Sequence, residues 1–127
     1  LFKYDHAIKN HIILLKDTSD QELSWLYENS MFTVYPSFYE GWGLPVAESL
    51  LHGTPVIASS KSSIPEIGGK LVDYFSPYSP EEIMAKIHKY YTDRTLLQKK
   101  KAEIVENYKP TSWDESYEQV ASAILGL

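Results

Sequence analysis

Two glutamates, Glu40 and Glu48, lie in one short segment with seven residues between them. Each oxygen of a carboxylate accepts hydrogen bonds, so carboxylates suit the neighbouring hydroxyl groups of a sugar. Gly41 and Gly43 lie between the glutamates, and glycine allows unusual backbone conformations and close approach of a ligand. Pro45 suits the first turn of a helix, whose free amides favour an anion such as a diphosphate. The segment therefore predicts a site for a ligand that carries both hydroxyl groups and phosphate.

Short apolar runs and helix signals predict an α/β chain that positions this segment. The strand candidates are the runs at 12–15, 32–35, 55–58 and, more weakly, 71–75. Helices are predicted to start near Ser19 and to run from Pro45 to about His52, with Gly53 at the end. Alternating strands and helices are typical of a parallel sheet with crossover helices. Ligands bind at the carboxyl edge of such sheets, which is where the glutamate segment begins.

The second part of the chain is predicted to be helical only. Ser79 and Ser112 each stand three residues before a glutamate, which is the capping-box pattern at a helix start. Asp93 is a candidate cap for another helix between them. With 127 residues, the chain is long enough for one domain, which we expect to span 1–127.

Composition excludes several classes of protein. Hydrophobic residues make up 43% of the chain, which argues against disorder, and there is no cysteine for a disulfide scaffold or a thiolate metal site. His6, His11 and His88 show no spacing with other ligand types, so no metal is expected. A formal net charge of −5 argues against a nucleic-acid partner. Because no apolar run reaches about 18 residues, a cytoplasmic setting is expected, and peripheral membrane association of a longer parent enzyme stays open.

The segment around Glu40 and Glu48 resembles the paired-glutamate motif of the retaining glycosyltransferases of family 4, also called group 1. The resemblance covers roughly residues 12–91, because further stretches fall in the family's order and spacing. These stretches are Tyr35-Pro36-Ser37, Glu40 to Pro45, Glu48-Ser49, Gly53 to Ser59 and Ile64 to Ile67. A lone pair of glutamates would carry no weight, whereas the whole series is highly specific.

The resemblance implies the GT-B fold, in which two Rossmann-like domains face each other across a cleft. The chain would be part of the carboxyl-terminal domain, a Rossmann-like parallel sheet flanked by helices, which binds a nucleotide-diphosphate sugar as donor. Catalytic Glu40 would hold hydroxyl groups of the donor sugar near the reacting centre, and Glu48 would hold the ribose hydroxyls. The implied donor-binding residues are Glu40, Gly41, Trp42, Gly43, Leu44 and Glu48, together with Lys16 and Asp17 near the base. No bound metal or other cofactor is implied.

One departure from the family pattern concerns positive charge. Family members normally carry a basic pair upstream of the glutamates that neutralises the departing diphosphate, an electrostatic role that is large in catalysis. Lys3, Lys9 and Lys16 do not stand at the matching position, and the amino-terminal acceptor domain is missing. We therefore expect a truncated donor domain that is inactive alone and that self-associates through an exposed sheet edge. The alternative is a non-catalytic or degenerate nucleotide-binding module of the same fold.

Overall fold

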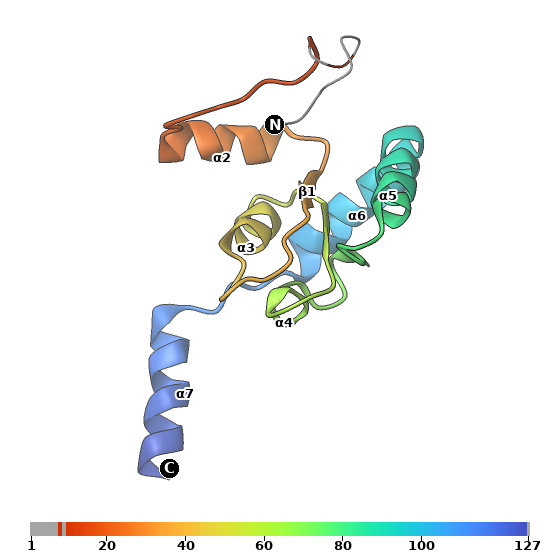
Figure 1. Cartoon of the computed structure of the whole chain (residues 1–127). Coiled ribbons are helices and arrows are strands. Elements are labelled where there is room, and N and C mark those ends of the chain that lie inside the picture. The colour runs from red at the N-terminus through yellow and green to blue at the C-terminus, as the bar shows by residue number, and fades with distance from the viewer. Residues whose placement is uncertain (1–7, 9, 127) are drawn as a thin grey trace.

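The computed structural model describes residue 8 and residues 10–126 of the chain as a small parallel sheet flanked by helices (Figure 1). The elements are α2 (Asp20–Asn29), β1 (Thr33–Tyr35), α3 (Leu44–Leu51), β2 (Val56–Ser59), α4 (Ile64–Gly68), β3 (Asp73–Phe75), α5 (Pro80–Thr92), α6 (Arg94–Asn107) and α7 (Trp113–Leu125). None of the helices in the described part of the chain is long and apolar enough to cross a membrane.

The sheet has three strands in the order β1-β2-β3, and both pairings are parallel. Every residue of the central strand β2 is buried, because helices cover both faces of the sheet, as its continuous apolar sequence predicts. Val56 and Ala58 pack on one face in a cluster with residues of α3 and α4, whereas Ile57 packs on the other face with residues of α5. Helix α6 contributes to both clusters, through Ile104 on the first face and Leu97 on the second.

Three of the four predicted strands are confirmed, with bounds that differ by one or two residues. The predicted helix starts at Ser19 and Ser112 are also confirmed, because both serines form complete capping boxes. At Ser79 the box is only half formed, since the Glu82 carboxylate accepts from the amide of Ser76 instead of that of Ser79. Asp93 caps α6 as predicted. These signals are local, which is why the sequence reveals them.

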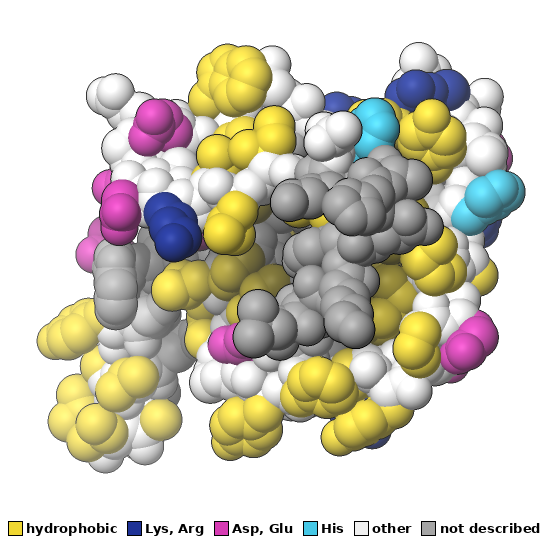
Figure 2. All heavy atoms as spheres, turned by 45° about the horizontal axis from the view of Figure 1, so that its top comes forward, with side chains coloured by type: hydrophobic (Ala, Val, Ile, Leu, Met, Phe, Trp, Pro, Cys, Tyr) yellow, Lys and Arg dark blue, Asp and Glu magenta, His cyan; other side chains and the backbone are white. Residues whose placement is uncertain are grey.

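The prediction of a buried strand at 12–15 is wrong. The segment takes no regular structure, and Ile13 and Leu14 are 82% and 79% exposed. An apolar run becomes a strand only where a neighbouring strand accepts its backbone hydrogen bonds, and β1 pairs with β2 alone in the described residues. Apolar side chains are also spread over the face of the molecule drawn in Figure 2.

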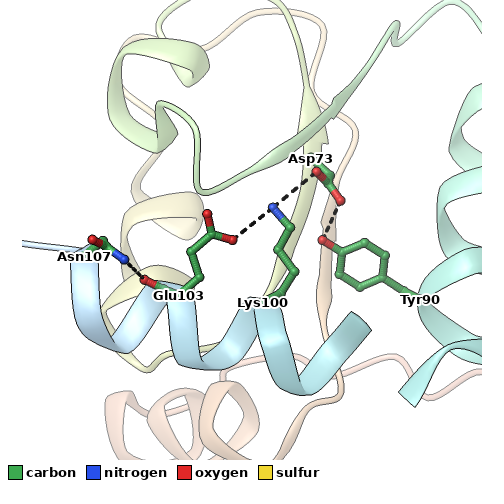
Figure 3. A network of polar contacts seen from close by, with 5 residues as sticks. All are labelled: Asp73, Tyr90, Lys100, Glu103 and Asn107. Carbon is green, nitrogen blue, oxygen red and sulfur yellow. Dashed lines mark hydrogen bonds and ion pairs between the residues drawn. The ribbon is translucent and has the colours of Figure 1, made fainter. Parts of the chain in front are cut away.

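A polar network joins β3 to α5 and α6 (Figure 3). The buried Tyr90 hydroxyl donates a hydrogen bond of 2.7 Å to one oxygen of Asp73. The Lys100 ammonium lies 3.6 Å from the other Asp73 oxygen and 3.5 Å from the Glu103 carboxylate. Burial, followed by the hydrogen bond to Asp73, raises the pKa of Tyr90 above its ordinary value. The network therefore fixes the position of α5 and α6 against the edge strand β3.

Replacing Tyr90 by Phe should lower the free energy of unfolding by about 1–2 kcal/mol, because Asp73 loses a charge-assisted hydrogen bond while the ring still fills the core. The neighbouring Tyr91→Phe is the matched control, since the Tyr91 side chain is 65% exposed and should tolerate the change. Urea unfolding of the two variants measures the difference, and equal stabilities would contradict the structural role of the Tyr90 hydroxyl.

Candidate functional site

The loop at 36–43, between β1 and α3, lies beside the loop that follows β2, because parallel strands end at the same edge of a sheet. Side-chain hydroxyls connect the two loops. Ser62 Oγ donates to the Glu40 carbonyl, and Ser63 Oγ lies 3.2 Å from that carbonyl oxygen and 3.0 Å from the Trp42 carbonyl oxygen. These serines hold the backbone on both sides of Gly41.

The Glu40 carboxylate is oriented by two hydroxyl donors. Tyr35 Oη and Ser37 Oγ donate to its Oε1 atom at 2.6 Å and 2.8 Å. These bonds, that from Tyr35 first and then that from Ser37, lower the pKa of Glu40, while burial and the Glu40 hydrogen bond raise the pKa of Tyr35 to about 12. Within the described residues no side-chain donor reaches Oε2, so an ionised and oriented carboxylate presents one oxygen for other partners.

The Glu48 carboxylate is oriented in the same manner from a different element. Glu48 lies on α3, and its Oε2 atom accepts a hydrogen bond of 3.0 Å from the Tyr27 hydroxyl on α2. Burial makes the largest contribution to the raised pKa of Tyr27, followed by the hydrogen bond to Glu48 and by the negative charge of that carboxylate. The Glu48 carboxylate on α3 is therefore oriented by a hydroxyl donor from α2.

A groove of about 480 Å³ lies between α3, α4 and the segment that leads to α7. Its lining includes three of the predicted residues, Trp42, Leu44 and Glu48, and also two charged residues that were not predicted to lie at the site, Glu66 and Lys109. Glu66 lies in the first turn of α4, within the matched stretch Ile64 to Ile67. Lys109 reaches the groove from the segment after α6 and had no sequence signal.

The remaining predicted residues are placed elsewhere. Lys16 and Asp17 line a separate hollow of about 420 Å³ against α2, with Trp25 among its other residues. The resemblance implied a place near the base for these two residues, in a loop after a first strand, and the structure has no strand at 12–15. Glu40 lies in the loop beside the groove and is not part of its lining. No group of three or more histidines, aspartates and glutamates in the described part of the chain is arranged to hold a metal ion.

The two glycines of the glutamate segment differ in what they do for the backbone. Gly43 caps α3 with a φ of 99°, and a Cβ atom there would lie 3.2 Å from Ile67 Cδ1. Gly41 has no positive φ, and a Cβ atom there would have nothing within 4 Å. The expectation that both glycines supply an unusual backbone conformation is therefore wrong for Gly41. That Gly41 leaves room for a ligand stays a prediction.

A substitution of Gly43 by Ala should lower the free energy of unfolding by about 1–2 kcal/mol, because the residue must keep a left-handed conformation beside Ile67. Gly41→Ala, two residues earlier in the same loop, should leave stability unchanged. Thermal unfolding of both variants tests this contrast. A stable Gly43→Ala would show that the turn into α3 does not require glycine.

The Tyr35→Phe substitution should raise the pKa of Glu40 toward its ordinary value, because Glu40 loses its strongest hydrogen-bond donor and keeps only Ser37. A lowered folded-state pKa stabilises the fold above the ordinary pKa, and that stabilisation is lost as pH falls through the lowered pKa. In the Tyr35→Phe variant, this stabilisation should be lost at a higher pH than in the wild type, because the Glu40 pKa is higher. Carboxyl-carbon NMR titration measures the pKa, with Tyr39→Phe as the control because Tyr39 is 82% exposed. An unchanged Glu40 pKa would contradict the assignment.

Comparison with known proteins shows the family of the chain. The family model described as glycosyl transferases group 1 matches residues 2–111, which include every element from α2 to α6. The O-antigen chain mannosyltransferase B of Escherichia coli is 34% identical over 104 residues, which are 82% of this chain and 27% of that protein.

Two further relatives match over shorter or more divergent stretches. The MMP alpha-(1->4)-mannosyltransferase of Mycolicibacterium hassiacum is 41% identical over 51 residues, 40% of this chain and 12% of that protein. The D-inositol 3-phosphate glycosyltransferase of Thermobifida fusca is 26% identical over 107 residues, 80% of this chain and 24% of that protein. The chain thus spans about a quarter or less of the length of these relatives. The family match over most of the chain shows that it belongs to the group 1 glycosyl transferases.

Proposed function

We propose that this chain is the donor-binding part of a retaining glycosyltransferase of family 4 with the GT-B fold, and that it binds a nucleotide-diphosphate sugar. The observation that carries the proposal is the presentation of the paired glutamates. Glu40 and Glu48 leave the same loop-to-helix segment, and each has one carboxylate oxygen bonded to a tyrosine hydroxyl. The second oxygen of each carboxylate can then accept hydrogen bonds from ligand hydroxyls.

The roles proposed for the residues are those that the family resemblance implies. Glu40 orients the hydroxyls of the donor sugar near the reacting centre, and Glu48 holds the ribose hydroxyls. The backbone amides of Trp42, Gly43 and Leu44 lie at the start of α3, where the helix dipole favours the diphosphate. In the hollow beside α2, Lys16 and Asp17 accommodate the base. The proposal requires no bound metal.

The transferred sugar is proposed to be a hexose. Mannose is the first candidate, because two of the relatives compared are named mannosyltransferases. The diphosphate departs, and an acceptor hydroxyl attacks the same face of the sugar, which retains the anomeric configuration. An acceptor domain and a basic pair that neutralises the diphosphate belong to another part of the enzyme. The chain alone would then transfer no sugar.

A non-catalytic nucleotide-binding module is the second candidate. The observation in its favour is the shortage of positive charge, since Lys109 is the basic side chain that lines the groove and Lys16 lines the separate hollow. A phosphoryl leaving group needs more charge compensation than one exposed ammonium provides. A basic pair in the polypeptide upstream would favour the enzyme, and a full-length protein without one would favour the module.

Ligand-observed NMR with UDP-, GDP- and ADP-mannose tests donor binding. We expect saturation transfer to one of them, and a loss of about tenfold or more in affinity in Glu48→Gln, because an amide cannot replace the charge-assisted bonds to ribose. Glu106→Gln, which changes an exposed glutamate on α6, is the matched control.

An unchanged affinity of the Glu48→Gln variant would contradict the assignment of Glu48 to the donor site. If the chain binds none of the three, the same measurement on the full-length polypeptide decides between a missing domain and a degenerate site. Binding there supports the enzyme, and its failure there removes the proposed function.

A further inference from the structure

Both paired glutamates receive a hydrogen bond from a tyrosine, and the two tyrosines come from different elements. Tyr35 is the last residue of β1 and bonds Glu40 across the loop that follows. Tyr27 lies on α2 and bonds Glu48 on α3, which is 21 residues away in the sequence. A glutamate side chain on a loop or an exposed helix turn samples several rotamers, so a fixed donor determines which rotamer is populated.

Tyr35 is a rigid donor because its backbone belongs to the sheet. It pairs with Ala58 of β2 in the parallel register, and its ring packs against the core cluster on the α3 face. The distance of 2.6 Å to Glu40 Oε1 is short, as expected for a hydroxyl that donates to an ionised carboxylate. The position of the Tyr35 hydroxyl therefore follows from the fold and not from the loop that it orients.

Tyr27 is held at both its backbone and its ring. The hydroxyl of Thr54, a residue that is 1% exposed, donates a hydrogen bond of 2.6 Å to the Tyr27 carbonyl. The Tyr27 ring stacks on His52, with centroids 5.6 Å apart and an interplanar angle of 11°. His52 caps the helix that carries Glu48, and the next residue of α2, Glu28, lies 3.4 Å from His52 Nδ1. Helix α2 is thereby fixed to α3 beside Glu48.

We propose that Tyr27 and Tyr35 are positioning residues of the donor site, and that α2 belongs to this site because Tyr27 orients Glu48. The inference rests on the proposed function, in which Glu48 holds ribose and Glu40 holds the donor sugar. It assigns the tyrosines different ligand parts. Tyr27 acts on the nucleoside part of the donor through Glu48, and Tyr35 acts on the sugar part through Glu40.

Tyr27→Phe and Tyr35→Phe in the full-length polypeptide test this division. Both variants keep the aromatic ring, so the stacking on His52 and the packing of Tyr35 remain. The probes are UDP, GDP and ADP, each alone and as its mannose conjugate, and calorimetric titration gives the affinities. Tyr27→Phe should lower the affinity for the nucleoside diphosphate and for its mannose conjugate by the same factor, about three- to tenfold. Tyr35→Phe should lower only the affinity for the mannose conjugate, by a similar factor.

A double-mutant cycle separates positioning from a merely structural role. If Tyr27 acts through Glu48, Tyr27→Phe should have no further effect on affinity in a Glu48→Gln background, since the carboxylate that it orients is gone. The matched control is Tyr91→Phe on the exposed side of α5, which should bind as the wild type does.

The outcomes distinguish the inference from the proposed function. A wild-type protein that binds no probe overturns the proposed function and the inference with it. A wild-type protein that binds, with tyrosine variants that bind equally well, overturns the inference alone. So does an effect of Tyr27→Phe that persists in full without the Glu48 carboxylate, because the hydroxyl would then act on the fold and not through Glu48.

Discussion

The parallel pairing of β1 with β2 is the constraint on which the site depends. It brings the carboxyl ends of both strands to one edge, so the loop at 36–43 and the loop after β2 meet there. At the opposite end of β1, the buried Ser49 Oγ lies 2.7 Å from Thr33 Oγ1 and 3.3 Å from the Thr54 carbonyl oxygen. These contacts connect the last turn of α3 to the start of β1 and to the turn before β2. A buried hydroxyl without such partners would cost free energy, so this connection holds α3 against the sheet.

The position of α3 determines in turn what the paired glutamates can reach. Gly43 turns the chain into the helix through a left-handed conformation, and the serines after β2 hold the preceding loop by its carbonyls. The backbone turn at Gly43 and the serine hydroxyls therefore determine the shape of the segment, and the carboxylates do not. Glu40 and Glu48 form no ion pair with a basic side chain in the described part of the chain, which leaves their charge available to a ligand.

Local signals in the sequence predicted most of the fold. Proline, glycine and the capping serines and aspartate act within one turn of their own positions. The helix α3 and the helix starts at Ser19, Asp93 and Ser112 therefore follow from a few neighbouring residues. The run at 12–15 was misread because burial depends on a neighbouring strand, which a run of four apolar residues does not specify.

The candidate site was predictable only in part for the same reason. The glutamate segment is local and was recognised, as was the turn at Gly43. The bond between Tyr27 and Glu48 joins distant residues of two helices, and the approach of Lys109 to the groove depends on how the chain leaves α6. Such contacts follow from tertiary packing, for which one sequence carries no local pattern.

Helix α6 has a consequence for how the molecule unfolds. It places Ile104 in the core cluster under α3 and Leu97 in the cluster under α5, so one rigid helix contributes to both faces of the sheet. A helix cannot detach at one end without bending, so opening of one face should disturb the contacts of α6 on the other. We therefore expect the two faces to unfold as a single cooperative unit, in which a core substitution under α5 also lowers amide-exchange protection at the glutamate segment on the opposite face.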